Sequence, residues 1–157
     1  MHRYRLLWSG RVSPQGVSFD YDPGRPFLVP EHLRAASAEA CRQSQQLGRQ
    51  VKNLPLYLVR DWSAAEQGLH LDLGLTCYQD YLGLSLCARE EAPLVLAVAA
   101  ATEIEGRIVL ERRSQAVAQG MGMLHVKPSG HVHPPHTPWQ ALLAEAWEEL
   151  ALRPEEL

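Results

Sequence analysis

Three glutamates near the end of the chain have the spacing of a metal-binding helix. Glu145, Glu148 and Glu149 stand at positions i, i+3 and i+4, which on a helix share one face at about 6 Å between Cβ atoms. Hard divalent cations prefer such carboxylate oxygens. The competing interpretation is a solvated polar face, as on most amphipathic helices. Two features favour a cation: the acids fall in the half of the helix where the dipole disfavours negative charge, and no basic residue stands three or four positions away before Arg153.

The helix that must hold these acids has a clear start signal. Thr137 is a hydroxyl N-cap candidate, and Pro138 suits the first helical position. The helix is expected to run to about Leu152, because Pro154 cannot continue it. At 100° per residue its apolar face, opposite the acids, is predicted to contain Leu142, Leu143, Ala146, Trp147 and Leu150.

Upstream of this helix the sequence alternates between strand and helix patterns. We expect one or two short strands, forming a hairpin, around Tyr4–Trp8 and Val12–Phe19, and a helix from Glu31 to about Gln50. A short helix should begin at Thr76 and end at Gly83, and Gly130 to Pro138 reads as a loop. Further strands are predicted at residues 54–59, 69–75, 94–102, 107–112 and 121–126, with a turn at Gly106 between the third and fourth. This mixture predicts an α/β (α+β) fold.

Length and composition limit the function classes. The 157 residues suit one domain, and a formal net charge of −3 predicts binding neither to nucleic acid nor to a membrane surface. Three cysteines without paired spacing favour reduced thiols. The longest apolar run, Pro93–Ala101, falls far short of the roughly 20 residues that span a bilayer. We therefore expect a cytoplasmic protein.

The acidic segment resembles the Nudix hydrolase signature, Gly–x5–Glu–x7–Arg-Glu-aliphatic-x-Glu-Glu-x-Gly-aliphatic. Gly130 matches its first glycine, Glu145, Glu148 and Glu149 match its three metal-binding acids, and Leu152 matches the closing aliphatic position. The chain departs from the signature at three positions: His136 replaces the first Glu, Ala144 the Arg and Ala151 the second Gly.

Segments outside the signature resemble one Nudix subgroup, which cleaves UDP-glucose and UDP-galactose. Leu73–Gly83, with the sequence LGLTCYQDYLG, is similar to its Leu-Gly-Leu-Thr-x-Tyr-x-Asp-aromatic-Leu-Gly motif. Arg112-Arg113-Ser114 and the later Pro128-Ser129-Gly130-His131 resemble its arginine-ended strand and Pro-Gly-Gly-His turn. The resemblance covers residues 69–152 and implies a Nudix-like α/β/α sandwich around a mixed sheet. Residues 1–68 would then be a strand–helix region packing on a partial Nudix-like domain at 69–157.

The resemblance implies hydrolysis of a nucleotide sugar to UMP and a sugar 1-phosphate, with Mg²⁺ or Mn²⁺ held by Glu145, Glu148 and Glu149. Those three acids are the catalytic candidates, one of them or a further Glu beyond the chain end acting as base. The candidates for substrate binding are Arg112 and Arg113 at phosphate, Tyr78 at uracil, Asp80 at ribose, and Gly130 and His131 in the turn.

Several alternatives stay open. Packing of Tyr78 and Tyr81 against the sheet is favoured over stacking on a base, and a charged strand end competes with phosphate binding by the arginines. His131, His133 and His136 suggest zinc, but no fourth ligand has regular spacing. The family has strands and a helix after its signature, whereas only five residues follow Leu152. We therefore expect a truncated chain, cover from residues 1–68, or a homodimer that completes the sheet. The alternative function is a non-catalytic binding or regulatory module.

Overall fold

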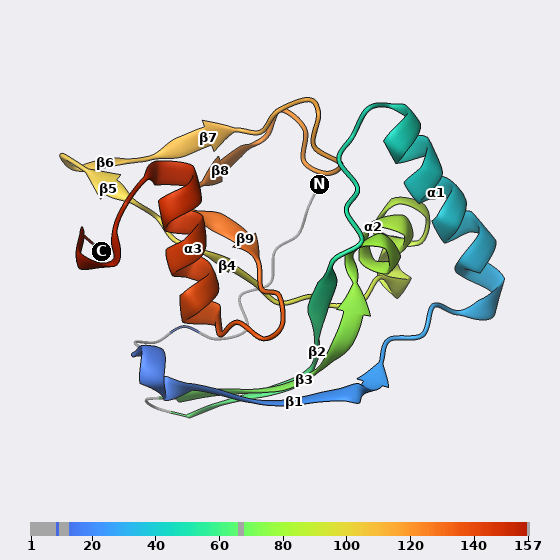
Figure 1. Cartoon of the computed structure of the whole chain (residues 1–157), viewed down its shortest axis with the longest axis horizontal. Helices are drawn as coiled ribbons and strands as arrows, with labels where there is room; N and C mark the ends of the chain where they lie inside the picture. The colour runs from blue at the N-terminus through green and yellow to red at the C-terminus, as the bar shows by residue number, and fades with distance from the viewer. Residues whose placement is uncertain (1–8, 10–12, 66–67, 157) are drawn as a thin grey trace.

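The computed structural model describes residues 9, 13–65 and 68–156, and it confirms the α/β (α+β) class with a mixed sheet (Figure 1). The strand expected around Tyr4–Trp8 lies outside the described residues. Within them no helix is long and apolar enough to cross a membrane.

In chain order the elements are η1 Pro14–Gly16, β1 Val17–Pro26, η2 Glu31–Leu33, α1 Arg34–Gln46, β2 Pro55–Ala65, β3 Gly68–Cys77, α2 Tyr78–Cys87, η3 Arg89–Glu91, β4 Ala97–Ala99, β5 Glu103–Ile104, β6 Arg107–Ile108, β7 Leu110–Arg112, β8 Leu124–Val126, β9 Ser129–His131, α3 Pro138–Leu150 and η4 Pro154–Glu156.

The central sheet has the order β1-β3-β2, with β1 parallel and β2 antiparallel to β3. Alternate residues of β3 enter the core because successive side chains of a strand point to opposite faces. Leu71 and Leu73 are buried there with Tyr57 of β2. Val132 and Ala141 complete this cluster, so the core reaches from the sheet to the start of α3.

A second group of strands continues from β2. The N–H of Leu96 donates to the carbonyl of Tyr57 at 3.0 Å, and the N–H of Val132 donates to the carbonyl of Leu96 at 3.0 Å. Beyond this point β4 pairs antiparallel with β9, with Val98 opposite Gly130. The predicted loop from Gly130 to Pro138 is therefore wrong at its start, because residues 129–131 gain a strand partner that lies about 30 positions earlier in the chain.

The strand expected at 107–112 is divided into β6 and β7, and β5 forms a hairpin with β6. Gly106, at φ 74°, lies in its turn as predicted.

The α1–α2 pair lies at the other end of the molecule from α3 (Figure 1). α2 begins after Cys77 and runs through Gly83 to Cys87, so the predicted N-cap at Thr76 and end at Gly83 are wrong. Gly83 is buried where α1 crosses, and a Cβ there would come within 2.6 Å of the Ser37 carbonyl oxygen. The glycine is thus explained by a close helix contact rather than by a helix end.

The start of α3 follows the prediction, whereas its faces do not. The Thr137 hydroxyl accepts from the Gln140 N–H, and the Gln140 side chain accepts from the Thr137 N–H, which completes a capping box. Trp147, assigned to the apolar face, is 56% exposed, whereas Ala146 of that face is buried as is Ala141. Glu145 and Glu149 are half-buried, so the side of α3 that packs on the strands also carries part of its acidic cluster.

The division at residue 68 stays a prediction. It falls at the connection between β2 and β3, two strands that pair along their lengths.

Candidate functional site

Glu145 lies directly over Gly130. α3 packs on β9 and β4, and a Cβ built on Gly130 would overlap the Glu145 carboxylate. Burial against the strand, together with the nearby charges of Glu149 and Glu148, raises the pKa of Glu145 to about 7. The absence of a side chain at Gly130 thus makes the space that Glu145 occupies.

Glu149 is held by two groups, one from the start of β9 and one from the connection that precedes it. The Ser129 N–H donates to Glu149 Oε2 at 3.0 Å, and Lys127 Nζ contacts Glu149 Oε1. Lys127 also pairs with Glu111 of β7 at 2.7 Å. Burial disfavours the ammonium, but its hydrogen bonds to Glu111 and Glu149 outweigh that and hold the pKa of Lys127 above 10.5. The premise that the acidic cluster lacks a basic partner is therefore wrong for Glu149.

Glu148 is solvent-exposed at the outer side of the acidic cluster. Among the described residues, no basic side chain forms an ion pair with Glu145 or Glu148. In that same part of the chain no group of three His, Cys, Asp or Glu side chains is arranged to hold a metal ion. The donor set fits Mg²⁺ in its common form, in which one or two carboxylates act with water and substrate phosphates.

A second cluster surrounds His131. Its ring lies 5.8 Å from that of Tyr78 and 5.4 Å from that of Tyr81, between centroids. Burial lowers the pKa of His131, and His133 and Arg113 lower it further, so the imidazole is neutral at pH 7. Tyr78 also packs against the buried cluster of Cys41, Leu82 and Ala118, in agreement with the favoured packing interpretation.

The two arginines of the predicted phosphate site point to different partners. Arg113 donates from Nε to the Gln119 carbonyl at 3.1 Å, and its charge acts on both Tyr78 and His131. Arg112 donates from Nη1 to the carbonyl of Gly122 at 3.1 Å and so braces the loop before β8. Both arginines therefore donate to backbone carbonyls, and only Arg113 also lies near the aromatic cluster.

Asp80 lies apart from both clusters. It stands two positions from Tyr78 on α2, a spacing at which side chains do not face each other. Its charge acts on Cys41 and Cys77, and it lines a surface hollow of about 530 Å³ between α1 and the segment after β1.

The acidic and aromatic clusters lie on opposite faces of β9. Gly130 faces α3 and Glu145, while the adjacent His131 faces the tyrosines of α2. Glu149 meets the edge of β9 away from β4, through the Ser129 N–H. Apart from Asp80 and Arg112, the predicted site residues thus form two groups on the two faces of one strand.

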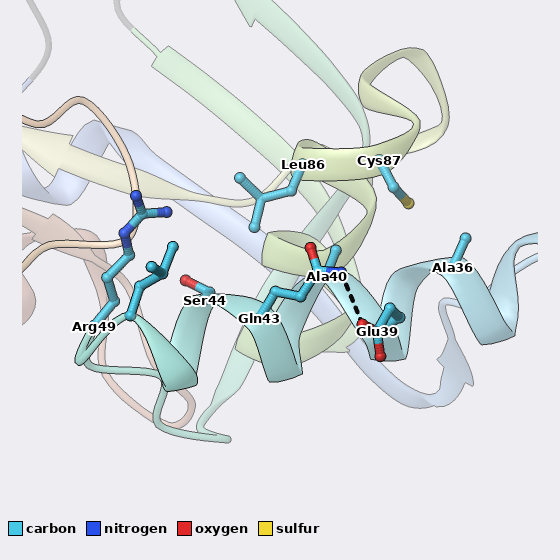
Figure 2. Close-up of a pocket in the computed structure, with 9 residues that line it drawn as sticks. Ala36, Glu39, Ala40, Gln43, Ser44, Arg49, Leu86 and Cys87 are labelled. Atoms are coloured by element: carbon cyan, nitrogen blue, oxygen red, sulfur yellow. Dashed lines mark hydrogen bonds between the residues drawn. The ribbon is translucent and has the colours of Figure 1, made fainter.

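A further hollow, of about 380 Å³, lies between α1 and α2 (Figure 2). Figure 2 shows Arg49 at one end, and Gln43 hydrogen-bonded to Glu39 in the middle. Ser44 lines the hollow, but its hydroxyl oxygen is inaccessible and has no hydrogen-bond partner among the residues that the structure describes. The hollow contains none of the predicted site residues.

The histidines proposed as a zinc alternative have separate partners. His133 Nδ1 lies 2.7 Å from the Pro55 carbonyl oxygen, whereas His131 contacts the tyrosines. His136 is exposed.

Sequence reasoning missed Lys127, Ser129 and Glu111. One signal was available: Lys127 is the only Lys or Arg between Arg113 and Arg153. A lone cation in a segment leading to an acidic helix is a candidate partner for that helix.

Comparison with known proteins adds no assignment: neither the protein-family models nor the curated proteins gave a match to this sequence.

Proposed function

We propose that this chain is a Nudix-type hydrolase that cleaves the diphosphate of a nucleotide sugar such as UDP-glucose, with Mg²⁺. The products would be UMP and a sugar 1-phosphate. The proposal rests on the sequence resemblance, and one structural observation supports it. Glu145 is held over Gly130 beside Glu148 and Glu149 with a pKa of about 7. A carboxyl tuned towards neutral pH in a packed polar cluster is typical of functional sites.

The chain's residues would divide the chemistry between them. Water attacks one phosphorus atom, the bridging P–O bond breaks, and one of the helix carboxylates accepts the proton of the water. When bound, Mg²⁺ would neutralise phosphate charge, with Glu145 and Glu148 as the free carboxylates closest to this role. Arg113 offers a guanidinium for phosphate, while Tyr78 and His131 offer ring faces for uracil. To meet both clusters, the diphosphate would have to pass the edge of β9.

Release of UMP from UDP-glucose tests this function. The purified chain is incubated with UDP-glucose and Mg²⁺, and UMP is measured for wild type, Glu148→Gln and the matched surface control Glu90→Gln. We expect release by wild type and Glu90→Gln, and a loss of at least tenfold for Glu148→Gln. Equal release by all three would refute the assignment of the acids. If the wild type binds UDP-glucose but releases no UMP, the alternative function, a non-catalytic binding module, is favoured.

We further propose that the chain is cytoplasmic and forms a homodimer through the strands β5–β8. Four large apolar side chains there are half exposed or more: Ile104, Ile108, Leu110 and Leu124. Leu110 and Leu124 lie on the same face of the β7–β8 pair, and exposed apolar patches are typical of association sites. Light scattering should give twice the mass of 17.6 kDa, and a monomer for Ile108→Asp. A wild-type monomer at high concentration would refute the dimer.

A further inference from the structure

We propose that Ser129, His125 and Glu111 form a hydrogen-bonded triad of nucleophile, base and carboxylate, which makes the Ser129 hydroxyl a site of acylation by small uncharged esters. This activity goes beyond the proposed hydrolase and does not rest on it, because none of the three side chains has a role in diphosphate cleavage. Two contacts carry the inference. His125 Nδ1 lies 3.0 Å from Ser129 Oγ, and His125 Nε2 lies 3.0 Å from Glu111 Oε2.

The members of the triad come from three strands. Glu111 of β7 stands opposite His125 of β8, so their side chains share one face of this strand pair. Ser129 begins β9, where its N–H donates to Glu149. The His125 side chain is 21% exposed, so its ring is held on both sides and still within reach of a small molecule. The apolar side chains of β7 and β8 proposed for the dimer lie on the opposite face.

The hydrogen-bond pattern determines the tautomer of His125. Hydrogen bonds from Lys127 and His125 lower the pKa of the Glu111 carboxyl, so Glu111 is ionised at neutral pH and can only accept. In the neutral imidazole the proton therefore lies on Nε2, from which it donates to Glu111. Nδ1 keeps its lone pair, and the Ser129 hydroxyl donates to it. A hydroxyl that donates to an imidazole oriented by a carboxylate is the arrangement that activates serine nucleophiles.

Acylation needs only the triad and an ester with a good leaving group. Ser129 Oγ attacks the carbonyl carbon of the ester while His125 Nδ1 accepts the hydroxyl proton. The bond between the carbonyl carbon and the leaving oxygen then breaks, and His125 passes the proton to the departing alcohol or phenol. The products are an acyl ester of Ser129 and the free alcohol or phenol, with His125 and Glu111 unchanged.

The surroundings of Ser129 define the class of ester. Glu149 accepts the Ser129 N–H at 3.0 Å, and Glu111 lies on the far side of the histidine, so an anionic ester is repelled. Because the Ser129 N–H is already engaged, it does not stabilise the oxyanion that forms during the attack. We therefore expect reaction with activated, uncharged esters such as aryl esters, and accumulation of the acyl-serine rather than rapid turnover.

Acetylation by p-nitrophenyl acetate at neutral pH tests the proposal. Release of p-nitrophenol is followed in time, and peptide mass spectrometry locates the acetyl group. We expect a burst of about one equivalent per chain with the acetyl group on Ser129, and no burst from Ser129→Ala. Ser18→Ala is the matched control, because Ser18 Oγ makes another serine–histidine contact, 3.0 Å from His70 Nδ1, at an exposed position. This control should retain the full burst.

Variants of the other two members distinguish a triad from a network that only braces the strands. His125→Gln should slow acetylation of Ser129 by about 100-fold, through loss of the general base. Glu111→Gln should slow it by about tenfold, because the charge that orients the imidazole is lost. The control His70→Gln should react at the wild-type rate. A bracing network would lose thermal stability in the first two variants, but it would give no acetyl-serine in the wild type.

Three results overturn the proposal. The first is wild-type acetylation at amines alone, and the second is acetylation of Ser18 as fast as that of Ser129. The third is an equal rate at Ser129 in wild type and His125→Gln; where circular dichroism shows that His125→Gln is unfolded, an equal rate in Glu111→Gln decides in the same way. Because p-nitrophenyl acetate contains no diphosphate, acetylation of Ser129 without UMP release from UDP-glucose would support the triad and refute the proposed hydrolase, and the reverse outcome would do the opposite.

Discussion

Substituting Glu145 by Gln should stabilise the metal-free protein at alkaline pH. The folded-state pKa of about 7 lies above the ordinary value of 4.5. Between these values the folded chain therefore binds more protons at this site than the unfolded chain does, and stability falls as pH rises. Ionisation of Glu145 thus destabilises the folded chain, and this destabilisation is absent at pH 4 and reaches its full size above pH 7.

The size of that cost follows from the pKa. Each tenfold change in proton affinity corresponds to about 1.4 kcal/mol, which gives an upper limit of about 3 kcal/mol. Because the Glu145 side chain is only partly buried, solvent screening reduces the expected gain for Glu145→Gln to about 1.5 kcal/mol at pH 8. In a chain of this length that gain corresponds to about 4 °C in Tm.

The assay is thermal unfolding followed by circular dichroism in EDTA, at pH 5 and pH 8, with Glu90→Gln as an exposed control. Glu145→Gln should exceed wild type at pH 8 and differ by only a few tenths of a kcal/mol at pH 5. An advantage of equal size at both pH values would show that the gain does not come from ionisation. A variant less stable than wild type at pH 8 would refute the reasoning altogether.

Two further substitutions test the packing around this acid. Gly130→Ala should destabilise the chain by about 1–3 kcal/mol, because its methyl group takes the space of the Glu145 carboxylate. In a Glu145→Ala background, Gly130→Ala should leave the free energy of unfolding in urea almost unchanged, and an equal loss of stability in both backgrounds would contradict the contact. Ala151→Gly should increase the free energy of unfolding by about 0.5–1 kcal/mol, since residue 151 ends α3 at φ 54°, where glycine is preferred. A lower urea midpoint for that variant would argue against the left-handed helix end.

The end of α3 explains why alanine is an unfavourable residue at position 151. Its φ is 54°, in the left-handed region where a side chain is strained and glycine is preferred. The sequence shows which residue stands at this position, but only the structure shows the backbone conformation that makes it unfavourable.

Local signals predicted the ends of elements well where the chemistry is local. The N-cap of α3 depends on Thr137 and its neighbours within one turn, and the structure has it as expected. The turn at Gly106 is equally local. The end of α2 was mispredicted because the reason for Gly83 is the approach of Ser37, 46 positions earlier.

The site was harder to predict for the same reason. Helical spacing puts Glu145 and Glu149 on one side of α3, but which side faces the sheet depends on Gly130 and Ala146. Lys127 lies in the connection between β8 and β9, so the periodicity of the helix could not identify it. Spacing identified the acids, whereas only packing could show that one of them has a lysine partner.

The pleat of β9 makes the molecule sensitive to insertions. Three consecutive residues make different contacts there. The Ser129 N–H donates to Glu149, Gly130 leaves the space that Glu145 occupies, and His131 contacts the tyrosines. Shifting this strand by one residue against β4 would turn each of them to the wrong face. After an insertion, Ser129 would take the place of Gly130, and its side chain would enter the space under Glu145. A single added residue between Lys127 and Ser129 should therefore be less tolerated than most substitutions in the same segment.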